Sequence, residues 1–325
     1  MRITKQMLPL AIFFLTLPFS LVYEYTLMVV MVLMIAICVL RLALVQYMLI
    51  NKSKDKRMIL ETISISHYVE KVRWCLDYLD LDYVEEEDVG ILGVFLLGRS
   101  VPQLKVPGTG VTIGNSADIL HYLYGANNTH PTMAPFLEPT QLSLSLEKKF
   151  DQLGEEYRRF IYFTKFSNLG SMPHMQELLM YEWGLYQPTI PLWQRYLLKP
   201  LAPVFVKLLQ KVLKITPEDS NKSLENAGKI LDEVESLLSD GRQFLLNTPN
   251  PTYIDFHLCS MVAVMTKPQN YGGRVYSQEA LAMIKQMEMP EQFNKEVQKI
   301  KERVAGKFVQ KVYETYRMKT IQKLD

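Results

Sequence analysis

The sequence is poor in cysteine and has no excess of charge of either sign. Its 325 residues include 3 cysteines, 36 basic and 34 acidic residues, with a formal net charge of +2. Three cysteines are too few for a disulfide framework, and no Cys-x-x-Cys pair or Cys/His cluster has the spacing of a zinc site. Balanced charge disfavours a nucleic-acid-binding protein and an acidic disordered chain. We therefore expect no metal and no nucleic-acid partner.

Charge is also scarce at the start of the chain. Residues 7–23 and 25–40 contain no charged side chain, and Glu24 and Arg41 are the interruptions. A membrane span needs about 20 predominantly apolar residues. The length of this region favours a membrane segment over a buried helical hairpin. A cleaved signal peptide is disfavoured because a second apolar stretch follows at once and no clear cleavage site is present.

Two arrangements of this segment remain open. Either residues 7–22 and 26–47 form two short crossings, or one longer helix crosses and the first stretch lies at the surface. Basic residues at 52–57 follow the segment, and such residues favour the cytosolic side. We therefore expect residues 1–56 to form an anchor of one or two transmembrane helices. This predicts an integral membrane protein that contacts the lipid bilayer through residues 7–50, with its C-terminal part in the cytosol.

The next part of the chain, residues 57–126, alternates between strand-like and helix-like patterns. The predicted elements are a strand at 58–64, a helix at 67–79, a strand at 83–89, a hairpin at 101–113 and a helix at 116–124. This order predicts an α/β thioredoxin-like domain. The acidic run at 85–88 is expected to be a strand end and loop.

Residues 127–140 are rich in proline and threonine and are expected to be a linker. Everything after them, residues 141–325, has helical periodicity and predicts an all-α C-terminal domain. Its last helix is expected over 291–323, as a basic amphipathic helix with a solvated face. Thr252 and Asp255 have the spacing of a helix capping box with Asp in place of Glu, which is a structural feature.

Four motifs resemble those of glutathione transferases and occur in that family's order. They are Ser-His-Tyr-Val-Glu-Lys-Val-Arg at 66–73, Val-Pro-Gln-Leu at 101–104, Gly-Asn-Ser-Ala-Asp-Ile at 114–119 and Thr-Tyr-Ile-Asp at 252–255. The first is similar to the serine-type active-site turn. The resemblance covers roughly residues 59–265. It implies a thioredoxin-like domain plus an all-α C-terminal domain, with glutathione as co-substrate and a homodimer as the usual state.

The resemblance assigns Ser66 the hydroxyl that donates to the glutathione sulfur. Ser66 would stand at a helix N-terminus, where an anion is favoured. The alternative is that Ser66 only caps the helix, and Ser64 is then the fallback donor. The family's proline at Pro102 is cis, and the backbone of Val101 would pair with the cysteinyl part of glutathione.

Ser116 is assigned to the γ-glutamyl carboxylate. Asn115 departs from the family's usual acidic residue, which pairs with the ligand's amino group, so charge assistance is lost. Its alternative role is a helix N-cap. His67 replaces the family's proline and is not expected to be catalytic. Cys75 and Cys259 lie on apolar helix faces and are expected in the core, so any reacting sulfur would come from glutathione.

Together these features predict a membrane-anchored glutathione transferase-like protein that activates the glutathione thiol for attack on apolar electrophiles or peroxides. The competing hypothesis is a non-catalytic interaction module with the same fold at a membrane, as in metaxin-like and axon-connection-like proteins. The membrane segment, Asn115 and His67 favour this alternative.

Overall fold

Two units make up the chain. The computed structural model describes residues 24–50, 57–63, 65–87, 101–109, 111–187, 190, 192–273, 284 and 286–317. Residues 1–54 and 93–99 belong to the first unit, and residues 55–92 and 100–325 to the second. In the first unit the structure describes one long helix, α2 (Glu24–Ile50).

The membrane prediction is not supported. None of the helices in the described ranges combines the length and the apolar character that a membrane crossing requires. In α2, the uncharged stretch between Glu24 and Arg41 covers residues 25–40, which is shorter than the ~20 residues of a span. This finding contradicts the prediction of an integral membrane protein with its C-terminal part in the cytosol. The first predicted crossing, residues 7–22, lies outside the described residues.

The second unit contains a four-stranded sheet in the order β2-β1-β3-β4. Its strands are β1 (Met58–Thr62), β2 (Tyr83–Glu87), β3 (Gln103–Val106) and β4 (Val111–Gly114). β1 is parallel to β2 and antiparallel to β3, and β3 is antiparallel to β4. Helix α3 (His67–Tyr78) provides the crossover that a parallel pair needs. This is the topology of a thioredoxin-like domain, as predicted from the order of elements.

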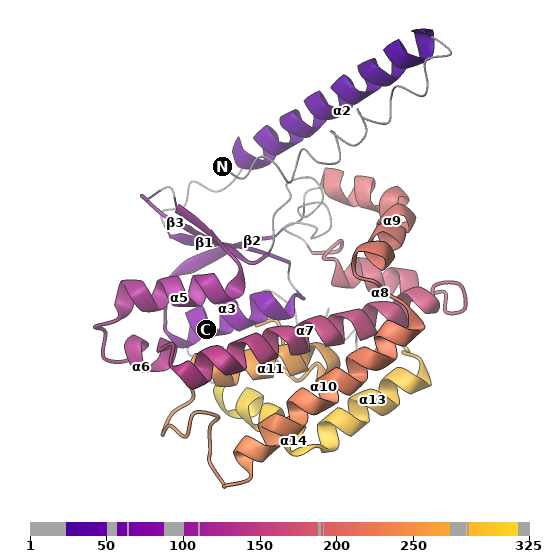
Figure 1. The fold of residues 1–325 in the computed structure, drawn as a ribbon. Coiled ribbons are helices and arrows are strands. Elements are labelled where there is room, and N and C mark those ends of the chain that lie inside the picture. The colour runs from indigo at the N-terminus through magenta and orange to yellow at the C-terminus, as the bar shows by residue number, and fades with distance from the viewer. Residues whose placement is uncertain are drawn as a thin grey trace. The chain divides into compact units, whose positions relative to one another are not determined.

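Helix α3 and helix α5 (Ser116–Asn127) pack on the sheet and face the helical part of the unit (Figure 1). The apolar residues of α3 recur at helical spacing, and Val69, Val72 and Cys75 are fully buried. On the far side of α3, the Trp74 ring stacks on Phe256 at 4.2 Å between centroids. α3 therefore lies in the middle of the core, between the sheet and the helices.

The helical part follows α5. Its elements are α6 (Met133–Leu137), α7 (Gln141–Ser167), α8 (Met175–Glu182), α9 (Leu192–Val212), α10 (Pro217–Leu238), α11 (Tyr253–Thr266), α13 (Glu291–Glu302), α14 (Val304–Val312) and the π-helical turn η2 (Tyr313–Arg317). The central element is α11, which packs on α3 and α7 and is buried along most of its length. The short helix α6 lies within the predicted linker.

The predicted single helix over 291–323 is wrong in two respects. The helix breaks at Arg303, which is extended (φ −65°, ψ 154°), and resumes as α14. The break allows Gly306 to pack directly on the Ile300 carbonyl, where a Cβ would collide. The segment is also not solvated at Arg317, whose side chain is 0% exposed, and residues 318–323 lie outside the described residues.

Candidate functional site

The sheet brings three separate segments to one edge. In the pairing register, Glu61 of β1 lies opposite Gln103 of β3, and Gln103 lies opposite Gly114 of β4. The residues that follow β1, precede β3 and follow β4 therefore emerge at the same edge. These are the turn with Ser66, the Val101–Pro102 dipeptide and the Asn115–Ser116 pair, so all five predicted site residues share this edge. Ser64 lies outside the described residues.

Val101 and Pro102 are joined by a cis peptide bond, as the resemblance led us to expect. The Pro102 carbonyl accepts a hydrogen bond from the Asn115 N–H at 3.2 Å. This bond ties the segment before β3 to the start of α5. Two of the three segments at the edge are therefore directly connected.

Ser66 occupies the N-cap position of α3, but its side chain does not form the capping hydrogen bond. Its backbone N–H donates to the Ile63 carbonyl at 2.9 Å, and its carbonyl accepts from the Glu70 N–H at 2.9 Å. Its side chain makes no capping hydrogen bond to the helix. The half-buried Ser66 hydroxyl therefore lies at the positive end of the helix dipole, but it does not cap the backbone N–H groups of α3.

Asn115 is the N-cap residue of α5, which is the alternative role predicted for it. Its backbone has φ 80° and ψ 135°, outside the left-handed helical region, and its side-chain oxygen accepts from the Ala117 N–H at 3.0 Å. Ser116, the first residue of α5, is 2% exposed. The Asn115 amide oxygen is therefore already engaged in capping α5.

His67, directly after Ser66, points into the protein interior. It is 5% exposed, and its Nε2 has no hydrogen-bond partner. Burial lowers the pKa of His67 to about 3, and the nearby Arg158 and His257 act in the same direction. Gly154 of α7 leaves room for the ring, because a Cβ there would lie 2.9 Å from Nε2. His67 is therefore a neutral imidazole at pH 7.

A polar cluster beside His67 links α3, α7 and α11, and it is buried apart from the Asp151 side chain, which is 37% exposed. His257 Nε2 lies 3.1 Å from Asp151 Oδ1, and Lys71 Nζ lies 3.9 Å from the same oxygen. The Tyr68 hydroxyl donates to the Asp151 carbonyl at 3.1 Å. Burial lowers the pKa of His257 to about 4 and also lowers the pKa of Lys71. This cluster could not be predicted from the sequence, because its members are spread over nearly 190 residues.

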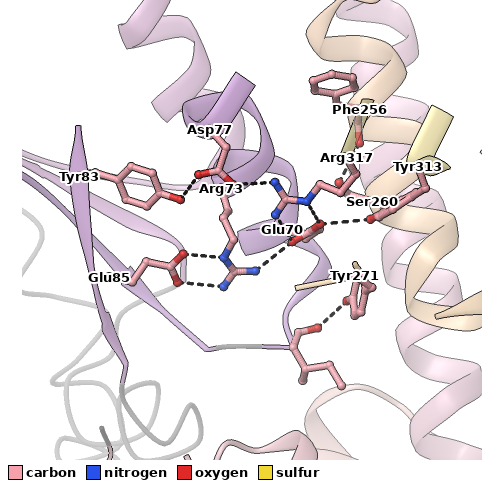
Figure 2. A network of polar contacts seen from close by, with 11 residues as sticks. Glu70, Arg73, Asp77, Tyr83, Glu85, Phe256, Ser260, Tyr271, Tyr313 and Arg317 are labelled. Carbon is pink, nitrogen blue, oxygen red and sulfur yellow. Dashed lines mark hydrogen bonds and ion pairs between the residues drawn. The ribbon is translucent and has the colours of Figure 1, made fainter. Parts of the chain in front are cut away.

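A second buried network lies at the other side of α3, centred on Glu70 (Figure 2). Arg73 donates to Glu70 at 3.0 Å and forms two bonds to Glu85 of β2, at 2.6 and 2.9 Å. Arg317 of η2 lies 3.0 Å from Glu70 through Nε and donates to Asp77 at 2.6 Å. The network is almost completely shielded from water, with side-chain exposures of 0–7%.

Tyrosines extend this network. Tyr83 donates to Asp77 at 2.7 Å, and the Tyr313 hydroxyl lies 3.3 Å from Glu70. Tyr271 donates to the Ile65 carbonyl at 2.7 Å, one residue before Ser66 (Figure 2). The turn that carries Ser66 is therefore bonded to the loop after α11.

Two structural predictions are confirmed. Asp255 accepts from the backbone N–H groups of Thr252 and Leu245, at 2.8 and 2.9 Å, which completes the capping box of α11. Cys75 and Cys259 are fully buried, and burial raises the pKa of both thiols. In the described part of the chain, no group of three or more His, Cys, Asp or Glu side chains is placed to hold a metal ion.

Comparison with known proteins gives matches among solved structures. No family model and no curated protein matches the sequence. The chain is similar to a glutathione S-transferase of Ceriporiopsis subvermispora in complex with glutathione (TM-score 0.45, 13% identity, covering 82% of this chain and 98% of that one). It is also similar to a glutathione S-transferase from Methylobacillus flagellatus with glutathione bound (0.41, 14%, 78% and 98%) and to FzlA from C. crescentus (0.35, 16%, 78% and 91%).

Proposed function

We propose that this chain binds glutathione at the edge of the sheet and activates its thiol for attack on an apolar electrophile. The observation that carries the proposal is that three chain segments meet at this edge beside the N-termini of α3 and α5, with the Ser66 hydroxyl not used as a cap. Helix N-termini favour anions such as a thiolate and a carboxylate.

Ser66 would donate its hydroxyl hydrogen to the sulfur. A free thiol titrates near pH ~8.5. Lowering that pKa by about two units requires ~2.7 kcal/mol of preferential stabilisation of the thiolate. One hydrogen bond to a charged group supplies roughly 1.5–3 kcal/mol, and the helix N-terminus adds ~0.3–1 kcal/mol. One well-oriented hydroxyl is therefore sufficient.

The remaining predicted residues would hold the peptide. The backbone of Val101 would pair with the cysteinyl part, and Ser116 at the start of α5 would bind the γ-glutamyl carboxylate. Because the Asn115 oxygen caps α5 and carries no charge, we expect it to bind the ligand's amino group only weakly. In the reaction the thiol proton passes to water, the sulfur bonds to the electrophilic carbon, and the leaving group departs with its electron pair.

Replacing Ser66 tests this assignment. We expect Ser66→Ala to lower kcat/KM for conjugation of a generic aryl halide by about 10–100-fold, because the lost hydrogen bond stabilises the thiolate by roughly 1.5–3 kcal/mol. The rate is measured with purified full-length protein at several glutathione concentrations, together with binding by calorimetry. Ser66→Thr retains a hydroxyl and should keep more of the rate. Ser239→Ala, which removes an exposed hydroxyl at the end of α10, should behave as wild type.

Two results would contradict the proposal, one for glutathione binding and the other for the role of Ser66. If no glutathione binds at millimolar concentration, the site is not a glutathione site. If glutathione binds but Ser66→Ala reacts at the wild-type rate, the sulfur is stabilised by another group.

A further inference from the structure

The turn that carries Ser66 is fixed from both sides by residues near the end of the chain. On one side, Tyr271 donates to the carbonyl of Ile65, which directly precedes Ser66. On the other side, the Glu70 N–H donates to the Ser66 carbonyl, and the Glu70 carboxylate is held by Arg317 and Tyr313. Figure 2 shows the contact between Tyr271 and the Ile65 carbonyl beside the contact between Arg317 and Glu70.

Tyr271 itself is held firmly. It is 1% exposed and lies in a tight turn, in which its N–H donates to the Pro268 carbonyl at 3.2 Å. Two residues later, Gly273 has a φ of +61°, and a Cβ there would lie 3.1 Å from Cδ of Arg73 and would collide with the Arg317 guanidinium. The turn therefore rests directly on the two arginines of the buried network, and this contact sets the position of the Tyr271 hydroxyl.

The orientation of Ser66 matters because a hydrogen bond weakens steeply when its angle falls below about 120°. A hydroxyl that caps a helix is oriented by that bond, but the Ser66 side chain makes no such bond. Its direction depends on the position of its own backbone. The peptide groups on either side of Ser66 are bonded to Tyr271 and Ile63 before it and to Glu70 after it.

We propose that Tyr271 is a positioning residue for the thiol site. Tyr271 holds the turn that carries Ser66 through the Ile65 carbonyl, while the contact between Glu70 and Arg317 holds the helical turn that follows. This inference rests on the proposed function and identifies what orients its donor. Loss of the Tyr271 hydroxyl would leave the peptide-binding residues Val101 and Ser116 in place. It would therefore impair thiolate stabilisation and not glutathione affinity.

The test compares Tyr271→Phe with wild type in the full-length chain. This change removes one hydroxyl and little volume. We expect faster hydrogen exchange at the Ser66 and Glu70 amides. The pH at which bound glutathione is half ionised, followed by thiolate absorbance, should rise by about one unit. At a pH at least one unit below the wild-type value, kcat should fall about tenfold, since there one pKa unit equals a factor of ten in the ionised fraction. KM for glutathione should change by less than about twofold, because its binding contacts remain.

Tyr157→Phe is the matched control. Tyr157 of α7 is equally buried, at 1% exposed, and its hydroxyl has no hydrogen-bond partner among the described residues. Its exchange, pH profile and kcat should match wild type. In the double variant Tyr271→Phe/Ser66→Ala, the pH profile should equal that of Ser66→Ala alone, because Tyr271 acts only through Ser66.

The outcomes separate this inference from the proposed function. If Tyr271→Phe exchanges like Tyr157→Phe, the positioning role is overturned whether or not glutathione binds. If Tyr271→Phe leaves the pH profile unchanged while Ser66→Ala shifts it, the positioning role is also overturned and the proposed function stands. If glutathione binds but Ser66→Ala itself shifts nothing, the Ser66 assignment fails and the positioning role fails with it, while glutathione binding at the edge of the sheet stands.

Discussion

Arg317→Met is expected to lower the free energy of unfolding by about 3–5 kcal/mol, the usual cost of breaking a buried ion pair. Arg317 is fully buried and contacts two carboxylates, those of Glu70 and Asp77, at 3.0 and 2.6 Å. Without it, Glu70 and Glu85 share Arg73, and Asp77 loses its ion pair while it retains the hydrogen bond from Tyr83. Since a domain is typically stable by only 5–15 kcal/mol, this loss would be a large fraction of the total.

The measurement is urea unfolding at pH 7 with the full-length chain. A double variant, Arg317→Met/Asp77→Asn, distinguishes uncompensated charge from lost packing. It removes the carboxylate that Arg317 pairs with at 2.6 Å, while Glu70 keeps its ion pair with Arg73. We expect the double variant to be more stable than Arg317→Met alone. If it is less stable, the cost of Arg317→Met does not come from unpaired charge.

A surface arginine provides the comparison. Arg242 pairs with Asp240 at 2.7 Å, and this pair is open to solvent on the Asp240 side, where the carboxylate is 51% exposed. Exposed ion pairs contribute little because water and salt screen them. Arg242→Ala should therefore change stability far less than Arg317→Met.

The strands, the first helices and the position of the candidate site could be predicted from the sequence. Alternating and 3.6-residue hydrophobic periods report which face of an element is buried, and this gives β1 and α3 directly. The motifs place Ser66, Val101 and Asn115 at element ends. Once strand order is known, these ends must come out at one edge of the sheet.

Buried charge could not be predicted in the same way. An assignment from hydrophobic periodicity places every arginine and glutamate on the solvent-facing side of its element. Arg317 is therefore expected on a solvated face, and Glu85 at a strand end. Their burial depends on partners 247 and 12 residues away in the chain. The same limit applies to Asp151 and His257, and to the hydroxyl of Tyr271. The membrane prediction was also wrong, because the uncharged stretch of α2 between Glu24 and Arg41 is shorter than the ~20 residues of a span.

The second large effect is expected in acid. His67 and His257 are 5% and 0% exposed, and burial lowers their pKa values to about 3 and about 4. Both pKa values lie below that of an unfolded histidine, ~6.5, so the unfolded chain takes up protons first as pH falls. The stability contributed by the neutral imidazoles is complete above pH ~6.5 and is lost progressively as pH falls towards 4 and 3.

Between pH 7 and pH 5 we therefore expect the free energy of unfolding to fall by about 4 kcal/mol, at ~1.4 kcal/mol per pH unit below 6.5 for each imidazole. Urea unfolding at several pH values measures the slope. His67→Asn/His257→Asn, which cannot bind these protons, should lose most of it, although its stability at pH 7 will be lower. His130→Asn should keep the wild-type slope, because His130 is exposed. If the double variant retains that slope, the two imidazoles are not the groups that acid titrates.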